Sequence, residues 1–307
     1  MTAAGERQEV RVDRAPVGVF VLVAFAGAWV VCVPLWLTPR HLGVPWAQAV
    51  LAAMMYTPAL GVLVATRLRR TPGLARQLGL GFGGSFRRCV PYFLFALLAV
   101  PALSLAAPFV AALLGVYDLD VHLSLFRETL AHAPGGRHLS LSPTLLAAAQ
   151  LASIPVAAVV PNGLLTFGEE IGWRGFLLPR LLPLGQWPAL VIVGVVWGLW
   201  HTPVLLLGFD YPLHHGLAVP LMVGFTVVVG ILIGWLRLST GSIWPGVLAH
   251  GALNASAGSV GLFLRAGSHA DTALAGITGI TGWILPLLVI GLLVAMRRLP
   301  VRHVVVV

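Results

Sequence analysis

The chain has 307 residues, of which 58% are hydrophobic and only 9% charged, and its mean hydropathy is +0.94. A soluble domain has too little apolar interior to bury that fraction, so the composition excludes the soluble globular class. The net charge of +9 is carried entirely by Arg, and in so apolar a chain it indicates membrane topology; we expect no nucleic-acid partner.

Eight apolar runs are long enough to cross about 30 Å of hydrocarbon, which takes about 20 helical residues. The sequence therefore predicts an all-α, polytopic membrane bundle of about eight transmembrane helices. The predicted spans are residues 16–37, 47–66, 89–116, 144–168, 186–208, 217–236, 243–264 and 276–296. We expect the embedded bundle to cover 16–296, with tails at 1–15 and 297–307.

The positions of the Arg residues predict which side of the membrane holds the chain ends. An even number of spans puts both ends on one side, and 15 of the 19 Arg lie in the tails and connections of that side. Cytoplasmic connections of membrane proteins are rich in Arg and Lys. We therefore expect an integral protein of the plasma membrane with both termini in the cytoplasm.

The longest polar connection, residues 117–143, follows the third predicted span and carries His122, His132 and His138. These side chains are metal-ligand types, but we predict a solvated outer loop.

The next segment, residues 144–182, is too long for one straight span. Nearly 40 mostly apolar residues would make a helix of about 60 Å, twice the membrane thickness. The segment must therefore bend or re-enter. The helix can break at Pro155, Pro161 and Gly163. Close packing of neighbouring helices is possible at Gly168, Gly172 and Gly175.

Two carboxylates in this segment stand out. Eight of the ten acidic residues fall in the predicted tails or outer connections, which leaves Glu169 and Glu170 in or against an apolar segment. Ionisable groups at membrane depth are costly, so they indicate function. Arg174 can pair with Glu170 one helical turn away, leaving Glu169 free on another face. An ordinary ion pair at a helix end is the alternative.

Two His residues lie within later predicted spans. His201 follows Trp197 by one helical turn, and a packing role beside the indole is its alternative interpretation. His250 precedes Asn254 by four residues, so both side chains share one helix face, about 6 Å apart along the axis. Interhelical hydrogen bonding could account for this pair.

Three motifs in this order and spacing resemble a known family. They are Glu169-Glu170-Ile-Gly-Trp-Arg174 for Glu-Glu-x-x-x-Arg, Trp197 to His201 for aromatic-x-x-x-His, and His250 to Asn254 for His-x-x-x-Asn. They look like the CPBP family of CAAX proteases and bacteriocin-processing enzymes, also called the Abi family of intramembrane proteases. The resemblance covers about residues 144–258, the expected protease core. The second motif usually begins with Phe, and we expect Trp197 to alter local packing more than chemistry.

The resemblance implies an intramembrane endopeptidase that acts on a membrane-associated peptide or protein. It implies that Glu169 is a general base acting with His201 on a water molecule. It also implies that the oxyanion and the first motif are stabilised by two further pairs, His250 with Asn254 and Glu170 with Arg174.

The family is classed with metalloproteases, and Glu169, His201 and His250 are zinc-ligand types. The sequence has no His-Glu-x-x-His element, and the same residues can activate water without a metal. We favour the metal-free site and keep zinc as the alternative.

Two other functions stay open, a proton- or cation-coupled transporter and a non-catalytic membrane partner or immunity protein. The sequence carries no signal for substrate identity or oligomeric state.

One conflict of depth follows from the predicted spans. His201 lies about 22 Å along a helix that begins near Gln186, whereas Glu169 falls near the cytoplasmic end of the preceding span. The two side chains can meet only if the overlong segment carries Glu169 deeper into the membrane.

Overall fold

The computed structural model describes residues 12–67, 72–83, 85–133 and 141–302, and this part of the chain is all helical, without a strand. One isolated bridge, between Leu119 and Leu264, pairs extended backbone there. The predicted all-α class is confirmed. Most of the expected N-terminal tail, the last residues of the C-terminal tail, and His138 lie outside the described residues.

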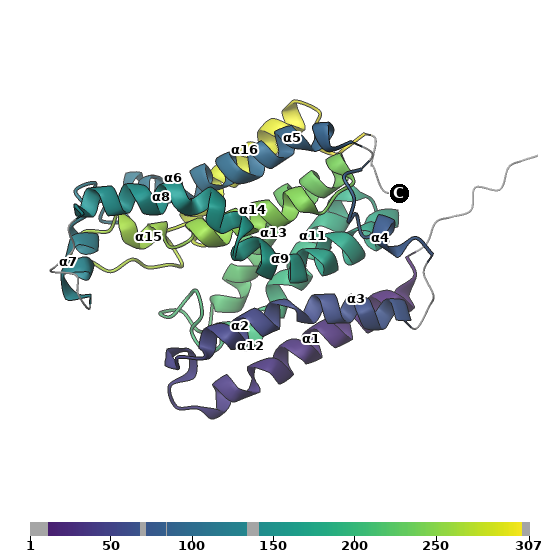
Figure 1. Cartoon of the computed structure of the whole chain (residues 1–307), viewed down its shortest axis with the longest axis horizontal. Helices are drawn as coiled ribbons and strands as arrows, with labels where there is room; N and C mark the ends of the chain where they lie inside the picture. Colours follow the sequence, from purple (N-terminus) through teal and green to yellow (C-terminus); the bar gives the residue numbers. More distant parts are fainter. Residues whose placement is uncertain (1–11, 68–71, 84, 134–140, 303–307) are drawn as a thin grey trace, which may run out of the picture.

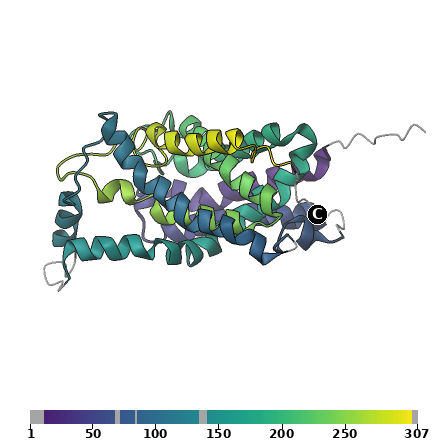
Figure 2. The ribbon, with the colours of Figure 1, turned by 90° about the horizontal axis from the view of Figure 1, so that it is seen from above.

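The helices follow one another along the bundle, and most run close to its long axis (Figures 1 and 2). They are α1 (Arg14–Leu37), α2 (Ala47–Met55), α3 (Thr57–Arg67), α4 (Leu74–Gln77), α5 (Phe86–Leu94), α6 (Val100–Leu113), α7 (Ser124–His132), α8 (Pro143–Val159), α9 (Asn162–Glu170), α10 (Leu178–Leu181), α11 (Gln186–Trp200), α12 (Thr202–Leu205), α13 (Ala218–Thr240), α14 (Trp244–Ser256), α15 (Ser259–Leu262) and α16 (Ile284–Ala295).

Shorter turns connect several of these helices. Two are π-helical, η2 (Phe95–Ala99) between α5 and α6, and η4 (Ile171–Leu177) between α9 and α10. Three are 3-10 turns, namely η1 (His41–Gly43), η5 (Leu182–Leu184) and η6 (Ile280–Trp283).

The expected number of eight spans is not confirmed. In the described residues, four helical stretches are long and apolar enough to cross a membrane: Arg14–Leu37, Ala47–Arg67, Phe86–Leu113 and Ala218–Thr240. The bent pair of helical stretches Pro143–Val159 and Asn162–Leu184, which begin with α8 and α9, raises the number to five if it counts as one span. The other predicted spans contain shorter helices, because α11 and α14 end at turns while the apolar sequence continues. Hydropathy alone does not mark those helix ends.

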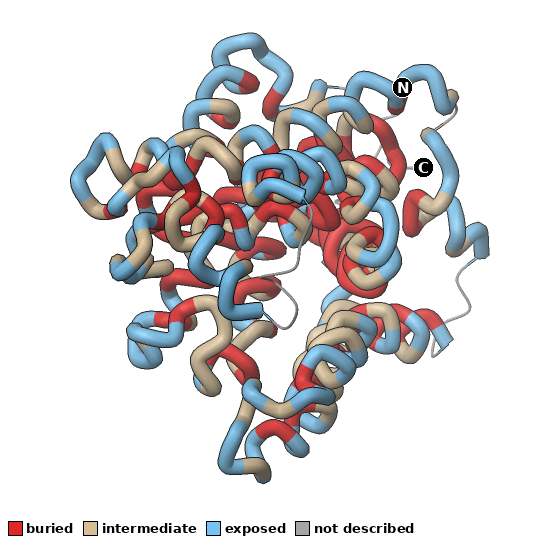
Figure 3. Tube along the Cα trace, turned by 60° about the vertical axis from the view of Figure 1, so that its left-hand side comes forward, coloured by how far each residue is buried: buried red, intermediate tan, exposed pale blue. Residues whose placement is uncertain are grey.

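The outward faces of the bundle are apolar. On α1, Leu22 and Val30 are each 69% exposed and Leu37 is 79% exposed. Buried residues concentrate in the centre of the bundle, while its periphery is exposed (Figure 3). Apolar side chains on long peripheral helices belong against lipid rather than water. The protein is therefore an integral membrane protein.

Both described ends of the chain lie at the same end of the bundle (Figure 1). The side-chain amide of Gln186 donates to the Val301 carbonyl at 2.7 Å, and nearby Arg180 interacts electrostatically with Asp13. An even number of passes through the bundle requires this arrangement. That this end faces the cytoplasm stays a prediction.

The overlong segment bends as its length requires. Helix α8 ends at Val159, and α9 begins at Asn162 with its axis turned by 42°. The break falls at Val160 and Pro161, since Pro161 has no N–H to continue the helix. Beyond the bend the chain stays helical through η4, α10 and η5, and it turns only at Gly185.

Helix α9 and its π-helical continuation pack closely against α2 and α3. A Cβ atom at Gly168 would lie 2.7 Å from the Met55 carbonyl oxygen, and one at Gly172 would lie 2.5 Å from the Pro58 Cβ. Neither distance is compatible with a side chain. The expected close packing is confirmed at these two glycines, and it brings α2 alongside the acidic pair.

Candidate active site

The position of the turn at Gly185 resolves the conflict of depth. Glu169 lies 16 residues before Gly185, and His201 lies 16 residues after it. Each arm of this helical hairpin therefore carries its side chain about 24 Å from the turn. The two residues reach the same depth because the first arm is longer than the spans drawn from hydropathy.

The first arm buries a complete ion pair. Glu170 ends α9, and Arg174 follows one turn later inside the π-helical segment η4, with Nη1 at 2.7 Å from Oε1 of Glu170. Both side chains are 0% exposed. Single π-helical turns within α-helices are frequent at functional sites. The predicted pairing of Glu170 with Arg174 is present.

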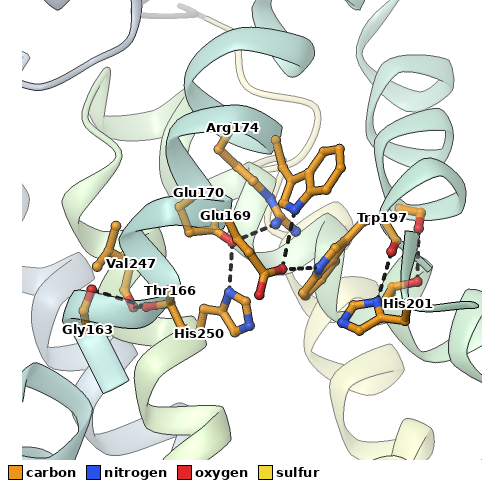
Figure 4. A network of polar contacts seen from close by, with 12 residues as sticks. Gly163, Thr166, Glu169, Glu170, Arg174, Trp197, His201, Val247 and His250 are labelled. Atoms are coloured by element: carbon orange, nitrogen blue, oxygen red, sulfur yellow. Dashed lines mark hydrogen bonds and ion pairs between the residues drawn. The ribbon is translucent and has the colours of Figure 1, made fainter. Parts of the chain in front are cut away.

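Glu170 also contacts the third motif. Its Oε1 lies 3.0 Å from Nδ1 of His250 on α14 (Figure 4). A carboxylate paired with Arg174 accepts hydrogen bonds, so Nδ1 of His250 carries a proton and donates it. The pair therefore orients the imidazole and points its Nε2 away from Glu170. The sequence did not indicate this link between the first motif and the third.

Glu169 is held by two indoles through one of its oxygens. Oε2 accepts from Nε1 of Trp197 at 2.7 Å and from Nε1 of Trp173 at 3.4 Å (Figure 4). Trp197 thus does more than pack, because it donates a hydrogen bond that Phe, which has no N–H, could not make. Trp173 lies inside the first motif, four residues after Glu169, and that spacing is the signal that could have identified it.

His201 caps the end of α11 with a defined orientation. Its Nδ1 lies 2.9 Å from the Trp197 carbonyl oxygen. A carbonyl only accepts, so Nδ1 carries the proton and Nε2 is left as an acceptor. The rings of Trp197 and His201 lie 6.0 Å apart, centre to centre, so the predicted indole contact is present as well.

Four of the six predicted site residues line one cavity of about 340 Å³: Glu169, His201, His250 and Asn254. Glu170 and Arg174 are fully buried behind it. Asn254 is exposed and lies on the same helix as His250, one turn further along. Separate pockets would have excluded a shared reaction centre, and the residues instead share this cavity.

The cavity contains one acidic residue that the sequence interpretation assigned to an outer connection. Asp210 lies in the loop between α12 and α13 and lines the cavity together with the motif residues. Asp210 therefore lies in a connection, as expected, but this connection reaches the cavity. The loop folds back onto the bundle, and no local sequence pattern marks that return.

The donor side chains of the cavity bear on the zinc alternative. Within the described parts of the chain, no three His, Cys, Asp or Glu side chains lie close enough together to hold one metal ion. Glu169, His201 and His250 share the cavity without forming such a set. The present arrangement does not fit a three-residue zinc centre. His122 and His132 are exposed, as expected for the outer loop.

Comparison with known protein families agrees with the motifs. Residues 143–256 match the family model described as type II CAAX prenyl endopeptidase Rce1-like. This segment is similar to the Rce1-like family. It runs from α8 to the end of α14 and contains all six predicted site residues, which confirms the family resemblance.

At the family level, this match supports an intramembrane protease of the CAAX type. The match favours neither the transporter nor the non-catalytic partner. No curated protein and no solved structure matches the chain significantly.

Proposed function

We propose that the protein is an intramembrane endopeptidase that cleaves a membrane-associated peptide or protein with a water molecule activated by Glu169 and His201. The observation that carries this proposal is the shared cavity of Glu169, His201, His250 and Asn254. Amide hydrolysis needs an activated water, donors for the oxyanion and a proton for the leaving amine, and these side chains are chemically suited to each task.

The base in this scheme is the Glu169 oxygen that no indole occupies. Oε2 is held by Trp197 and Trp173, so Oε1 is available to take a proton from water. The unprotonated Nε2 of His201 accepts a hydrogen bond from the second O–H of that water. This contact orients the lone pair of the water oxygen toward the substrate carbonyl. The new C–O bond then forms as the proton moves to Glu169.

The oxyanion is stabilised by the third motif. With Nδ1 directed at Glu170, His250 donates to the oxyanion through Nε2 when the ring carries both protons, and the Asn254 amide supplies a second donor. The tetrahedral intermediate collapses, Glu169 returns its proton to the leaving nitrogen, and the C–N bond breaks. Glu170 and Arg174 position His250 without touching the substrate.

No step of this scheme passes through a metal ion. The zinc alternative requires the Glu169, His201 and His250 side chains to move together when the metal binds. The partners we propose are the lipid bilayer and a membrane-associated substrate, with the protein in the plasma membrane and both termini in the cytoplasm.

The decisive experiment compares membrane peptides from cells that express wild type, Glu169→Gln or Glu128→Gln. Mass spectrometry should find cleavage products with the wild type and with Glu128→Gln, whose exposed carboxylate lies on α7. Glu169→Gln should lower their formation by about 10²–10⁴-fold, the usual contribution of a general base. Equal product with Glu169→Gln at equal protein level would remove the proposal.

A further inference from the structure

The ionisable lining of the cavity is unusual for a site that would bind the carboxylate end of a peptide. Within the described chain, the only Asp, Glu, His, Lys or Arg residues that line the cavity are Glu169, His201, Asp210 and His250. No Arg lines it, and the sequence contains no Lys. Two of these four are carboxylates. The cavity therefore attracts positive charge and offers an anionic substrate group no permanent cation.

The nearest guanidinium cannot serve an incoming carboxylate. Arg174 is fully buried, pairs with Glu170 at 2.7 Å, and stacks 4.4 Å from the centre of the Trp197 ring. The Trp197 and Glu169 side chains beside this cation line the cavity, whereas Arg174 does not (Figure 4). Arg174 is therefore already paired within the first motif and does not face the cavity.

Asp210 differs from Glu169 in having no partner within the described protein. No hydrogen bond or ion pair engages its carboxyl group, although the residue lines the cavity. Burial without a partner raises the pKa of this carboxyl to about 6. A carboxylate in such a place is stabilised by a cation from outside the chain.

The backbone around Asp210 is held so that the residue stays at the cavity. Its φ of 59° lies in the left-handed region, which Asp adopts more readily than most residues. The Thr272 hydroxyl donates to the Asp210 carbonyl at 2.5 Å, and the Tyr211 hydroxyl donates to the Thr278 carbonyl at 2.9 Å. These contacts fasten the loop to the segment before α16 and leave the Asp210 carboxyl unused.

We propose that Asp210 is a specificity residue that selects substrates with a Lys or Arg side chain close to the cleaved bond. The proposal rests on the proteolytic function above and names the substrate class of that site. Once Glu169 serves as base, Asp210 is the one carboxylate of the cavity that is available for recognition. The polar but uncharged lining residues are Gln48, Asn162, Thr226, Asn254 and Thr278.

The test uses full-length protein in detergent micelles and a peptide library made by digesting a membrane proteome at Glu residues, so that Lys and Arg stay inside the peptides. Cleavage sites that appear with wild type and not with Glu169→Gln are then sequenced. We expect Lys or Arg to be enriched about tenfold within a few positions of these sites, the effect of one partly desolvated ion pair. Absence of enrichment overturns the specificity proposal alone, whereas absence of Glu169-dependent cleavage overturns the proposed function and the specificity together.

A matched set of variants assigns the preference to Asp210. From the library, one cleaved peptide and its copy with Gln in place of the basic residue are compared by kcat/KM. The ratio of kcat/KM for the basic peptide to that for its Gln copy should fall toward one in Asp210→Asn and recover in Asp210→Glu. In Asp210→Arg the preference should invert, so that a copy with an acidic residue at this position is cleaved best. Asp118→Asn, whose carboxylate binds the Ser268 hydroxyl outside the cavity, should keep the wild-type ratio. A wild-type ratio in Asp210→Asn contradicts the assignment, and because it is a ratio it does not depend on how much protein folds.

Discussion

The indole Nε1 of Trp197 lies 2.7 Å from Oε2 of Glu169 and joins the proposed base to the helix that carries His201. The same indole packs edge-on against the His250 ring, with ring centres 5.0 Å apart. One side chain therefore contacts groups from all three motifs, since Arg174 stacks over it as well. A change at Trp197 should affect catalysis although the indole does not touch substrate.

The first prediction concerns this contact. Trp197→Phe keeps an aromatic ring but removes a donor to a carboxylate, an interaction worth about 1.5–3 kcal/mol. We expect kcat to fall by about tenfold or more with little change in KM. Trp173→Phe, which removes the longer 3.4 Å contact, should have a smaller effect.

Trp200→Phe is the matched control, since its indole donates to the Thr57 hydroxyl at 3.1 Å and not to Glu169. Steady-state kinetics on one peptide should rank the losses as Trp197, then Trp173, then Trp200. Equal losses in all three variants would indicate general packing damage instead.

The second prediction concerns the buried ion pair of Glu170 and Arg174. Arg174→Ala leaves the Glu170 carboxylate buried without its cation, which typically costs about 3–5 kcal/mol. The double variant Glu170→Gln with Arg174→Met removes both charges and should be more stable than Arg174→Ala alone. Thermal unfolding in detergent, measured for both, checks the order. The reverse order would show that Arg174 does not neutralise this carboxylate.

The third prediction concerns metal. The proposed mechanism uses no metal ion, so purified protein should keep its peptidase activity after prolonged chelation and dialysis. Zinc content by elemental analysis is measured on the same sample. Loss of activity on chelation, with recovery on adding zinc and one bound zinc per chain, would favour the alternative.

The fourth prediction concerns pH. Because burial raises the pKa of Asp210 to about 6, its carboxyl is neutral below that pH and charged above it. The preference for basic over neutral peptides should be full above pH 6 and disappear as the pH falls through 6. Other titratable groups face this loop from the cavity and from neighbouring turns: Glu169, His201, His250, Tyr211, His214, His215 and Asp271.

These neighbours affect the rate for basic and neutral peptides alike, so the ratio of the two kcat/KM values reports on Asp210. Measured from pH 5 to 8, the wild-type ratio should change and the Asp210→Asn ratio should stay flat. A pH-dependent ratio that persists in Asp210→Asn would assign the titration to another group.

Residue type and spacing were sufficient to predict much of the fold and of the site. Long apolar runs predicted α1, α13 and the rod from α5 to α6 to within a few residues, because about 20 apolar residues leave few alternatives to a span. The convergence of the motifs in one cavity also followed from the rarity of ionisable groups at membrane depth.

The remaining features depend on tertiary contacts. Hydropathy does not show where α11 and α14 end, and the predicted number of eight spans is not confirmed. The cavity position of Asp210 depends on the contacts of Thr272 and Tyr211 with residues far along the chain, and these have no local pattern. Likewise, the link from Glu170 to His250 joins residues 80 positions apart.

The helical hairpin that turns at Gly185 fixes the two residues of the proposed water-activating pair relative to each other. Glu169 and His201 lie the same number of residues from the turn. A thinner bilayer, a tilt of the hairpin or a shift along its axis therefore moves both residues together. Their mutual alignment depends on counting residues within one hairpin and not on the thickness of the lipid. A single inserted residue in either arm, by contrast, would rotate one partner by about 100° and separate them.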